Sequence, residues 1–130
     1  KGLRFIFADW QLPQEVFNSG LVAIDKHYFS LSKKYGYEVT TPENVINMLG
    51  YTHLRNGDTE QAIEVFKENV NRYTFSSNVY DSLAEAYENN KQLDQAKTNY
   101  KKAYDLGKEQ NHPNTSVYLK NFNRVKKALK

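Results

Sequence analysis

Apolar residues in the middle of the chain recur with a period of 34 residues. Large and small apolar positions of a first unit return at the same offset in a second: Ile46, Leu49, Gly50, Ala62 and Phe66 return as Tyr80, Leu83, Ala84, Ala96 and Tyr100. A period of this length indicates pairs of antiparallel helices, which bury their apolar faces only against a neighbouring pair. The pattern predicts an all-α fold in which two units, residues 43–76 and 77–110, stack on one another.

Two positions of the repeat hold small residues in both units, namely Gly50 with Ala84 and Ala62 with Ala96. Where two helices cross, a small side chain lets the backbones approach, and larger neighbours fill the space around it. We therefore expect helix crossings at these positions. The larger neighbours expected there are Leu49, Phe66, Leu83 and Tyr100.

Capping and breaking residues predict where the repeat helices begin and end. Thr41, Pro42 and Glu43 form an N-terminal signal for the first helix, and Gly57 is expected to close it. The other predicted signals are Asp58 or Thr59 at the start of the second helix, Ser76 and Ser77 at the start of the third, and Gly107 at the end of a fourth helix over residues 93–106.

The segments on either side of the repeats are predicted to be helical as well. Residues 13–42 are predicted to form N-terminal packing helices: Pro13 can start a first turn, and apolar residues that step by three and four predict an amphipathic helix that ends near Gly36. Within residues 111–130, a last helix from about Thr115 is expected to cap the array of repeats. The first apolar stripe is Phe17, Leu21, Ile24, Tyr28, Leu31 and Tyr35, and the second is Tyr118, Phe122, Val125 and Leu129.

Residues 1–12 hold a dense group of large apolar residues and are expected to be the end of an upstream domain or a linker. The spacing favours a short helix, although an alternation typical of a strand is also present. Because such a group must be buried somewhere, we expect it to dock on an upstream domain or to be covered by self-association, which makes a homo-oligomer the alternative. The candidate docking residues are Leu3, Phe5, Phe7 and Trp10.

Composition and charge exclude several classes of site. The absence of cysteine excludes thiol catalysis, disulfides and cysteine-ligated zinc, but it leaves a cytoplasmic and a periplasmic compartment equally open. No run of 18 apolar residues exists, so no membrane span is expected. The net charge of +3 combines +1 over residues 1–42, −3 over residues 43–110 and +5 over residues 111–130. Because a basic helix of this kind is usually solvated, we expect no nucleic-acid partner.

The chain shows no arrangement of residues typical of catalysis. Nucleophile elbows, phosphate-binding loops, dinucleotide fingerprints and zinc-binding His-Glu motifs are absent from the sequence. The histidines, His27, His53 and His112, are widely separated, and acidic pairs such as Glu60 and Glu64 are expected on a solvated helix face. We therefore predict that the chain is not an enzyme and holds no cofactor and no metal.

Two stretches carry a resemblance to a known family, INMLGYTHLRNGDTEQAIEVF and YDSLAEAYENNKQLDQAKTNY. Each resembles the tetratricopeptide repeat. The resemblance implies a short superhelix of two repeats with N-terminal helices and a C-terminal capping helix. It also implies that a protein or peptide partner binds in the concave groove, which the first helix of each repeat lines.

The groove positions implied by this resemblance are Asn47, Tyr51, Leu54, Arg55, Asp81, Glu85 and Glu88. Asn47 and Tyr51 stand where family members that bind chaperone tails carry lysine and asparagine, so that carboxylate clamp is absent. The acidic run Asp81, Glu85 and Glu88 would prefer a basic or polar segment, and ordinary solvated helix surface is the alternative.

A longer resemblance covers nearly the whole chain and rests on the strings LRFIFADWQLP and HYFSLSKKYGYEVTTPENVINMLGY. They are similar to the C-terminal region of bacterial esterases of the α/β-hydrolase fold. This resemblance implies a non-catalytic appendage whose partner is the upstream hydrolase domain, with the catalytic residues in that domain. The start at Lys1 rather than at methionine fits a piece cut from a longer polypeptide or a processed terminus. A stand-alone adaptor is the alternative.

Overall fold

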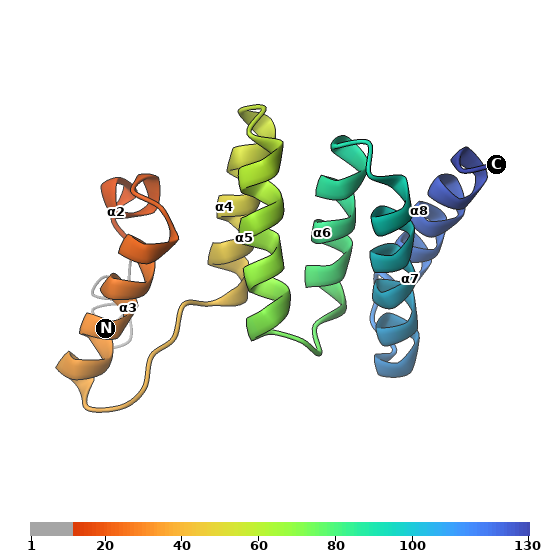
Figure 1. Ribbon diagram of the computed structural model, residues 1–130. Helices are drawn as coiled ribbons and strands as arrows, with labels where there is room; N and C mark the ends of the chain where they lie inside the picture. The colour runs from red at the N-terminus through yellow and green to blue at the C-terminus, as the bar shows by residue number, and fades with distance from the viewer. Residues whose placement is uncertain (1–11) are drawn as a thin grey trace. The chain divides into compact units, whose positions relative to one another are not determined.

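The computed structural model describes residues 12–130, and all regular secondary structure in this part of the chain is α-helix (Figure 1). The all-α prediction is therefore confirmed. The predictions on the docking residues Leu3, Phe5, Phe7 and Trp10 concern residues outside the described range. The helices are α2 (Gln14–Asn18), α3 (Leu21–Tyr35), α4 (Glu43–Arg55), α5 (Thr59–Arg72), α6 (Ser77–Asn89), α7 (Leu93–Gln110) and α8 (Thr115–Ala128).

Two units can be distinguished by their internal contacts, with the division between Val45 and Ile46. The first contains α2 and α3, where one helix was predicted across the apolar stripe from Phe17 to Tyr35. That prediction is wrong at Gly20, whose φ of 100° interrupts the helical backbone and leaves Phe17 in the short α2. The predicted end is confirmed, because Gly36 closes α3 in the left-handed conformation that glycine adopts without a Cβ penalty.

The segment that follows α3 is tied back to that helix by hydroxyl groups. The amide of Val39 donates to Ser32 Oγ over 2.6 Å, and Ser32 Oγ in turn donates to the carbonyl of Val39 over 2.9 Å. Thr41, predicted as the cap of the first repeat helix, donates its hydroxyl proton to Asp25 Oδ1 over 2.6 Å. Buried Thr41 therefore anchors this segment to α3 just before α4 begins at Glu43.

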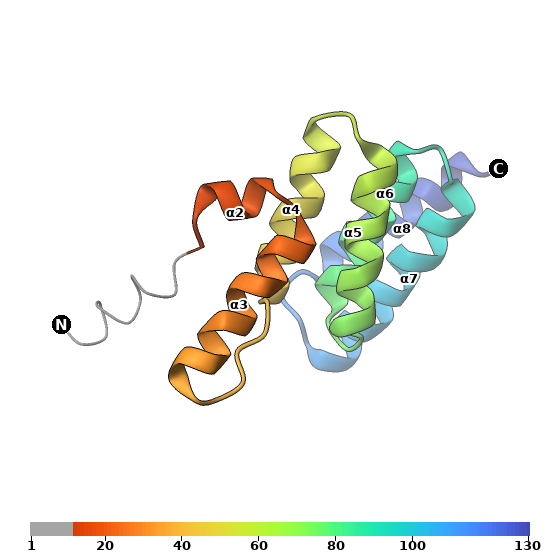
Figure 2. The same cartoon turned by 60° about the vertical axis from the view of Figure 1, so that its left-hand side comes forward.

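The second unit contains the repeats, and α5, α6 and α7 run alongside one another in both views (Figures 1 and 2). Its first crossing is between α4 and α5. A Cβ at Gly50 would collide with the ring of Phe66, and the ring of Tyr51 meets Phe66 edge to face with centroids 5.1 Å apart. The predicted reason for a small residue at position 50 is thus confirmed.

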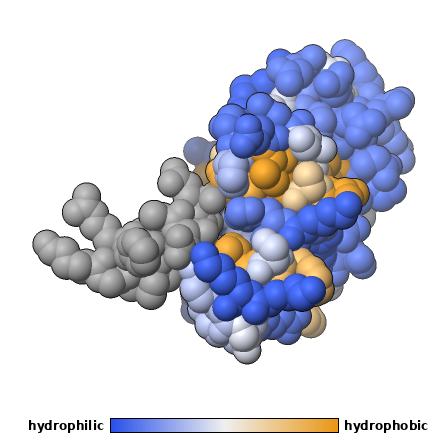
Figure 3. Space-filling view, turned by 90° about the vertical axis from the view of Figure 1, so that its left-hand side faces the viewer, coloured by the Kyte–Doolittle hydropathy of each residue, from blue (hydrophilic) through white to orange (hydrophobic). Residues whose placement is uncertain are grey.

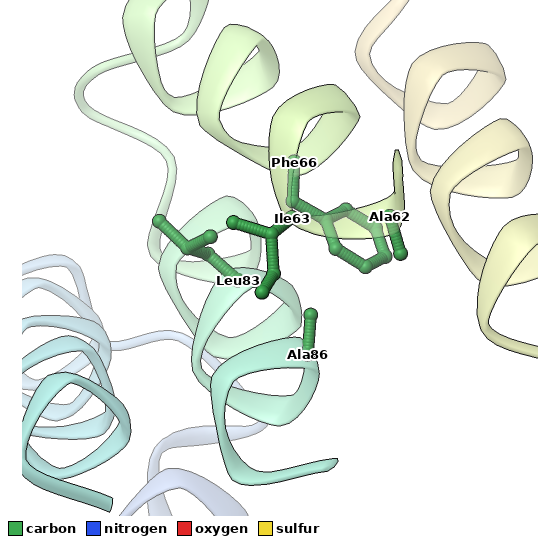
Figure 4. Close-up of a cluster of buried hydrophobic side chains, with 5 residues drawn as sticks. All are labelled: Ala62, Ile63, Phe66, Leu83 and Ala86. Atoms are coloured by element: carbon green, nitrogen blue, oxygen red, sulfur yellow. The ribbon is translucent and has the colours of Figure 1, made fainter. Parts of the chain in front are cut away.

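The corresponding crossing in the second repeat is between α6 and α7. There Ala84 packs against Ala96 and Tyr100 in a buried cluster that also contains Val125 of α8. Between the two repeats, Ile63 of α5 points toward Leu83 of α6, and the ring of Phe66 lies beside Ala62 (Figure 4); Ala86 of α6 belongs to the same cluster. Each helix pair therefore completes its core only with the next element, as the repeat pattern predicted.

Asp58 and Ser76 occupy the predicted cap positions of α5 and α6, although neither side chain forms the capping hydrogen bond to the helix. The predicted stop at Gly107 is wrong. Helix α7 continues to Gln110 and ends at Asn111, which has a φ of 54°. Gly107 is a packing residue, because a Cβ there would lie 2.9 Å from Thr115 Oγ1 and 3.1 Å from the ring of Tyr118.

Helix α8 begins at Thr115 as predicted and packs against α7. Two members of its predicted stripe, Tyr118 and Val125, are 1% exposed, and Phe122 is partly buried beside Val125. Leu129 was also predicted in the stripe, but it lies beyond the helix and is 38% exposed. Placing the domain boundaries after residues 12, 42 and 110 stays a prediction.

Candidate functional site

Polar side chains on the first helices of the two repeats form hydrogen bonds with one another. The hydroxyl of Tyr51 on α4 donates to Glu85 Oε1 on α6 over 2.8 Å. One turn earlier, Ser82 Oγ of α6 donates to Asn47 Oδ1 of α4 over 2.6 Å. These bonds join four polar groups on the neighbouring surfaces of α4 and α6, where the resemblance to the tetratricopeptide repeat predicts a partner-binding groove.

A second set of bonds joins α6 to α8. Asn121 Nδ2 donates to Asp81 Oδ1 over 3.1 Å. Arg124 holds Glu88 with two nitrogens, Nε to Oε2 at 3.1 Å and Nη2 to Oε1 at 2.6 Å. The buried Tyr100 of α7 donates its hydroxyl proton to the same Glu88 Oε1 over 2.7 Å. Helix α8 therefore extends the line of polar contacts that begins on α4.

We call this set of side chains the polar face, and its members are Asn47, Tyr51, Asp81, Ser82, Glu85, Glu88, Asn121 and Arg124. Two of the predicted groove residues do not belong to it. Leu54 packs against the core formed by α5 and α6, and the exposed Arg55 donates to Thr52 Oγ1 on its own helix. The structure thus brings together Asn47, Tyr51 and the three predicted acids.

Three members of the polar face, and Tyr100 beside it, were not predicted from the sequence as parts of this site. The three members are Ser82, Asn121 and Arg124. Arg124 was included only in the solvated basic tail. A signal for the α8 residues was present in the helical spacing. Asn121 lies three residues after the buried Tyr118 and four before the buried Val125, and Arg124 lies three residues after Asn121. Residues that flank such a stripe face the neighbouring helix.

The polar face carries three carboxylates and one guanidinium. In the part of the chain that the structure describes, Glu88 forms an ion pair with Arg124, whereas Asp81 and Glu85 accept hydrogen bonds only from the neutral groups of Asn121 and Tyr51. The face therefore carries two more negative than positive charges, and one of its carboxylates without an ion pair among the described residues, Glu85, lies in the wall of an open cleft.

The pKa directions follow from this arrangement. The hydrogen bonds from Arg124 lower the pKa of Glu88, with a smaller contribution from the hydroxyl of Tyr100. Burial raises the pKa of Asp81, and the bond from Asn121 only partly offsets that effect. Burial also raises the pKa values of Tyr51 and Tyr100, which keeps both hydroxyls protonated as donors.

The raised pKa of Asp81 predicts that its negative charge destabilises the fold near neutral pH. A group whose pKa is higher in the folded state contributes stability while protonated, and this contribution is lost as the pH rises through the folded pKa. Asp81→Asn keeps an oxygen that accepts from Asn121, so we expect it to raise the free energy of unfolding near neutral pH. The gain in stability should vanish below pH 3.8, the ordinary pKa of an aspartate, because the carboxyl group is then protonated in both the folded and the unfolded protein.

Urea unfolding of the Asp81→Asn variant and of the unchanged protein at neutral and at acidic pH measures this difference. Other groups titrate in both proteins, so their contributions cancel in the comparison. Asp105→Asn, which removes an exposed carboxylate from α7, is the control for a general change in charge. A lower stability of Asp81→Asn at neutral pH would show that the carboxylate stabilises the fold.

An open cleft of about 580 Å³ borders the polar face between α6 and α8. Its walls are formed by Glu85, Glu88, Asn89, Lys91, Tyr100, Asn121 and Arg124. These groups offer the carboxylates of Glu85 and Glu88, the cationic groups of Lys91 and Arg124, two amides and one aromatic hydroxyl, so the cleft suits hydrogen bonding to a polar group.

Residues 12–130 contain neither a candidate metal site nor a candidate membrane span. Within this range, no group of three or more histidine or acidic side chains is placed to hold a metal ion. None of the helices in the same range combines the length and the hydrophobicity needed to cross a bilayer. In the view of Figure 3, hydrophobic areas interrupt a largely hydrophilic surface.

Comparison with known proteins gave one family. Residues 44–70 and residues 77–108 each match the family model described as the tetratricopeptide repeat. The first match covers α4 and most of α5, and the second covers α6 and most of α7. No curated protein matches the chain.

Proposed function

We propose that the chain is a non-catalytic module that binds a protein partner through the polar face, because its α4–α5 and α6–α7 pairs match the tetratricopeptide repeat model. Tetratricopeptide repeats generally mediate protein–protein interaction and are generally non-catalytic. The polar face lies on the first helices of both repeats, the surface that the family uses for binding. The observation that carries this proposal is the pair of carboxylates, Asp81 and Glu85, that form no direct ion pair with any residue from 12 to 130.

The charge of the polar face favours a partner segment that carries basic residues. Glu85 accepts one bond from Tyr51 at Oε1 and lies in the wall of the open cleft, where a second donor can approach it. A carboxylate bonded to a cation forms stronger hydrogen bonds than one bonded to neutral donors. A basic segment would therefore supply the charge that Asn121 and Tyr51 do not.

Removing the two negative charges without removing the hydrogen-bond acceptors tests the proposal. In the double variant Asp81→Asn with Glu85→Gln, both side chains retain an oxygen for Asn121 and Tyr51. We expect this variant to bind a short fluorescent peptide of glycine, serine, lysine and arginine about tenfold more weakly, since two ion pairs at a partly exposed surface together contribute about 0.4–2 kcal/mol. Fluorescence anisotropy at two salt concentrations measures the effect.

The matched control is the double variant Glu60→Gln with Glu64→Gln, which removes the same charge from α5, outside the polar face. It should bind the basic peptide with nearly unchanged affinity. Equal weakening by both double variants would mean that only net charge matters. Binding of an acidic peptide in preference to the basic one would overturn the proposed chemistry of the partner.

Substitution of the three acids by lysine would be a poorer test. Lysine at position 88 would break the ion pair with Arg124, and lysine at position 81 would lose the acceptor for Asn121. Both changes disturb the contact between α6 and α8. A loss of binding could then result from a displaced helix, which the neutral variants avoid.

A finer form of the proposal makes this module the C-terminal appendage of a bacterial esterase, with the upstream hydrolase domain as its partner. It rests on the resemblance of the strings LRFIFADWQLP and HYFSLSKKYGYEVTTPENVINMLGY alone. The coding sequence upstream of Lys1 tests it. A hydrolase domain with a nucleophile elbow supports the appendage, and its absence there supports a stand-alone adaptor.

A further inference from the structure

Arg124 is bound by the polar face in the way that a ligand's arginine would be. Its guanidinium forms the two bonds to Glu88, lies 5.8 Å from the centroid of the Tyr100 ring and places Nη2 3.4 Å from the Tyr100 hydroxyl. We call Glu88 and Tyr100 the guanidinium seat. It combines a forked carboxylate contact with an aromatic neighbour, which a guanidinium satisfies better than an ammonium group.

The seat is preformed, and its present occupant can leave it. Tyr100 is 1% exposed, and its hydroxyl fixes Glu88 Oε1 from the buried side. The side chain of Arg124 is 52% exposed, whereas that of Glu88 is 28% exposed. A half-exposed ion pair contributes little to stability because water competes for both charges. Arg124 is also held by its own helix, since Nη1 donates to Asn121 Oδ1 over 2.8 Å, and water can replace each of these bonds at the exposed side of the guanidinium.

Helix α8 does not depend on Arg124 for its position. Its buried anchors are Tyr118, which packs on Val79 and Leu106, and Val125, which packs with Ala84 and Ala96. The side chain of Arg124 can consequently turn into solvent while α8 stays in place. The cleft beside it offers the space from which another side chain can reach Glu88.

Resting on the proposed binding of a basic segment, we propose that the partner inserts an arginine into the guanidinium seat and displaces Arg124 from it. Arg124 is then a built-in competitor that lowers the affinity of the free module for its partner. Lysine-bearing segments engage Asp81 and Glu85 but do not take the seat, because an ammonium group cannot form the forked contact with Glu88.

The test compares two short fluorescent peptides, one of alternating glycine, serine and arginine and the other with lysine at each arginine position. We expect Arg124→Ala to bind the arginine peptide about fivefold more tightly than the unchanged protein does, the factor that matches the upper range for an exposed ion pair. The lysine peptide should gain clearly less. Lys120→Ala removes one positive charge from an exposed position of the same helix and is the matched control.

A second measurement does not depend on any variant. The Nε–Hε resonance of Arg124 in the unchanged, isotope-labelled protein should move toward the position of a free arginine as the arginine peptide is added. The lysine peptide should leave it in place. Circular dichroism of Arg124→Ala and Arg124→Lys checks that α8 remains folded, and Arg124→Lys should show part of the gain because it keeps the charge without the fork.

The outcomes separate this inference from the proposed function. If neither peptide binds to the unchanged protein or to Arg124→Ala, the proposed binding of a basic segment is wrong. If the basic peptides bind but Arg124→Ala gains no more than Lys120→Ala, or gains equally for arginine and lysine, the guanidinium seat is not a partner site. An Arg124 resonance that stays in place while the arginine peptide is bound would likewise show that Arg124 is not displaced.

Discussion

Tyr118→Ala is expected to lower the free energy of unfolding by about 3–5 kcal/mol, the range for truncating a buried aromatic side chain. Tyr118 is 1% exposed and packs in one cluster with Val79, Tyr80, Ala103 and Leu106. It is the large residue by which α8 fills the core next to α6 and α7. Urea unfolding followed by circular dichroism measures the loss, and α8 should be the first helix to lose protection in hydrogen exchange.

Two control variants distinguish the contribution of the ring from that of the hydroxyl and from a general effect of substitutions in α8. Tyr118→Phe keeps the ring and removes the hydroxyl, which accepts a hydrogen bond from Ser77 Oγ over 3.2 Å, so we expect a loss of about 0.5–1.5 kcal/mol. Val117→Ala changes an exposed neighbour on the same helix and should be nearly neutral. A loss for Tyr118→Ala no larger than that for Tyr118→Phe would mean that α8 is not anchored by this ring.

Ala62→Leu and Ala96→Leu are each expected to cost about 1–3 kcal/mol, because added methylene groups in a filled core force neighbours out of their preferred rotamers. Both alanines are fully buried. Ala62 shares a cluster with Phe66 and Leu83, and Ala96 shares one with Tyr100. Denaturant unfolding of each variant measures the cost.

Glu60→Leu introduces the same side chain at an exposed position of α5 and provides the comparison. It should change stability by less than about 0.5 kcal/mol, as is usual for surface substitutions. If Glu60→Leu were the more damaging change, the assignment of small residues to the helix crossings would be wrong.

The helix pairs could be predicted from the sequence because their packing is local and repeated. The small residues Gly50 and Ala84 recur at one offset, and each meets an aromatic ring of the next helix. Two boundaries could not be predicted, since glycine has two roles. Gly20 breaks a helix through its positive φ, whereas Gly107 lies inside a helix and serves as a gap for Thr115 and Tyr118. The sequence does not distinguish these roles.

The polar face was predicted only where it follows the repeat. The period placed Asn47, Tyr51 and the three acids on the first helices, and the structure joins Tyr51 to Glu85 across that period. Asn121 and Arg124 come from α8, whose register depends on how far α7 continues. The 34-residue period does not determine the length of α7, so the contacts of Arg124 with Glu88 could be identified only in the structure.

Helix α7 is about one turn longer than α5, which changes the spacing between successive helix pairs. Helix α6 starts 34 residues after α4, whereas α8 starts 38 residues after α6. A duplicated unit inserted between Ser76 and Ser77 would keep the spacing of the units on both sides. The same unit added behind Gln110 would follow a helix that is about one turn too long. Gene duplication can therefore add repeats between α5 and α6, while the packing of α8 on α7 is retained.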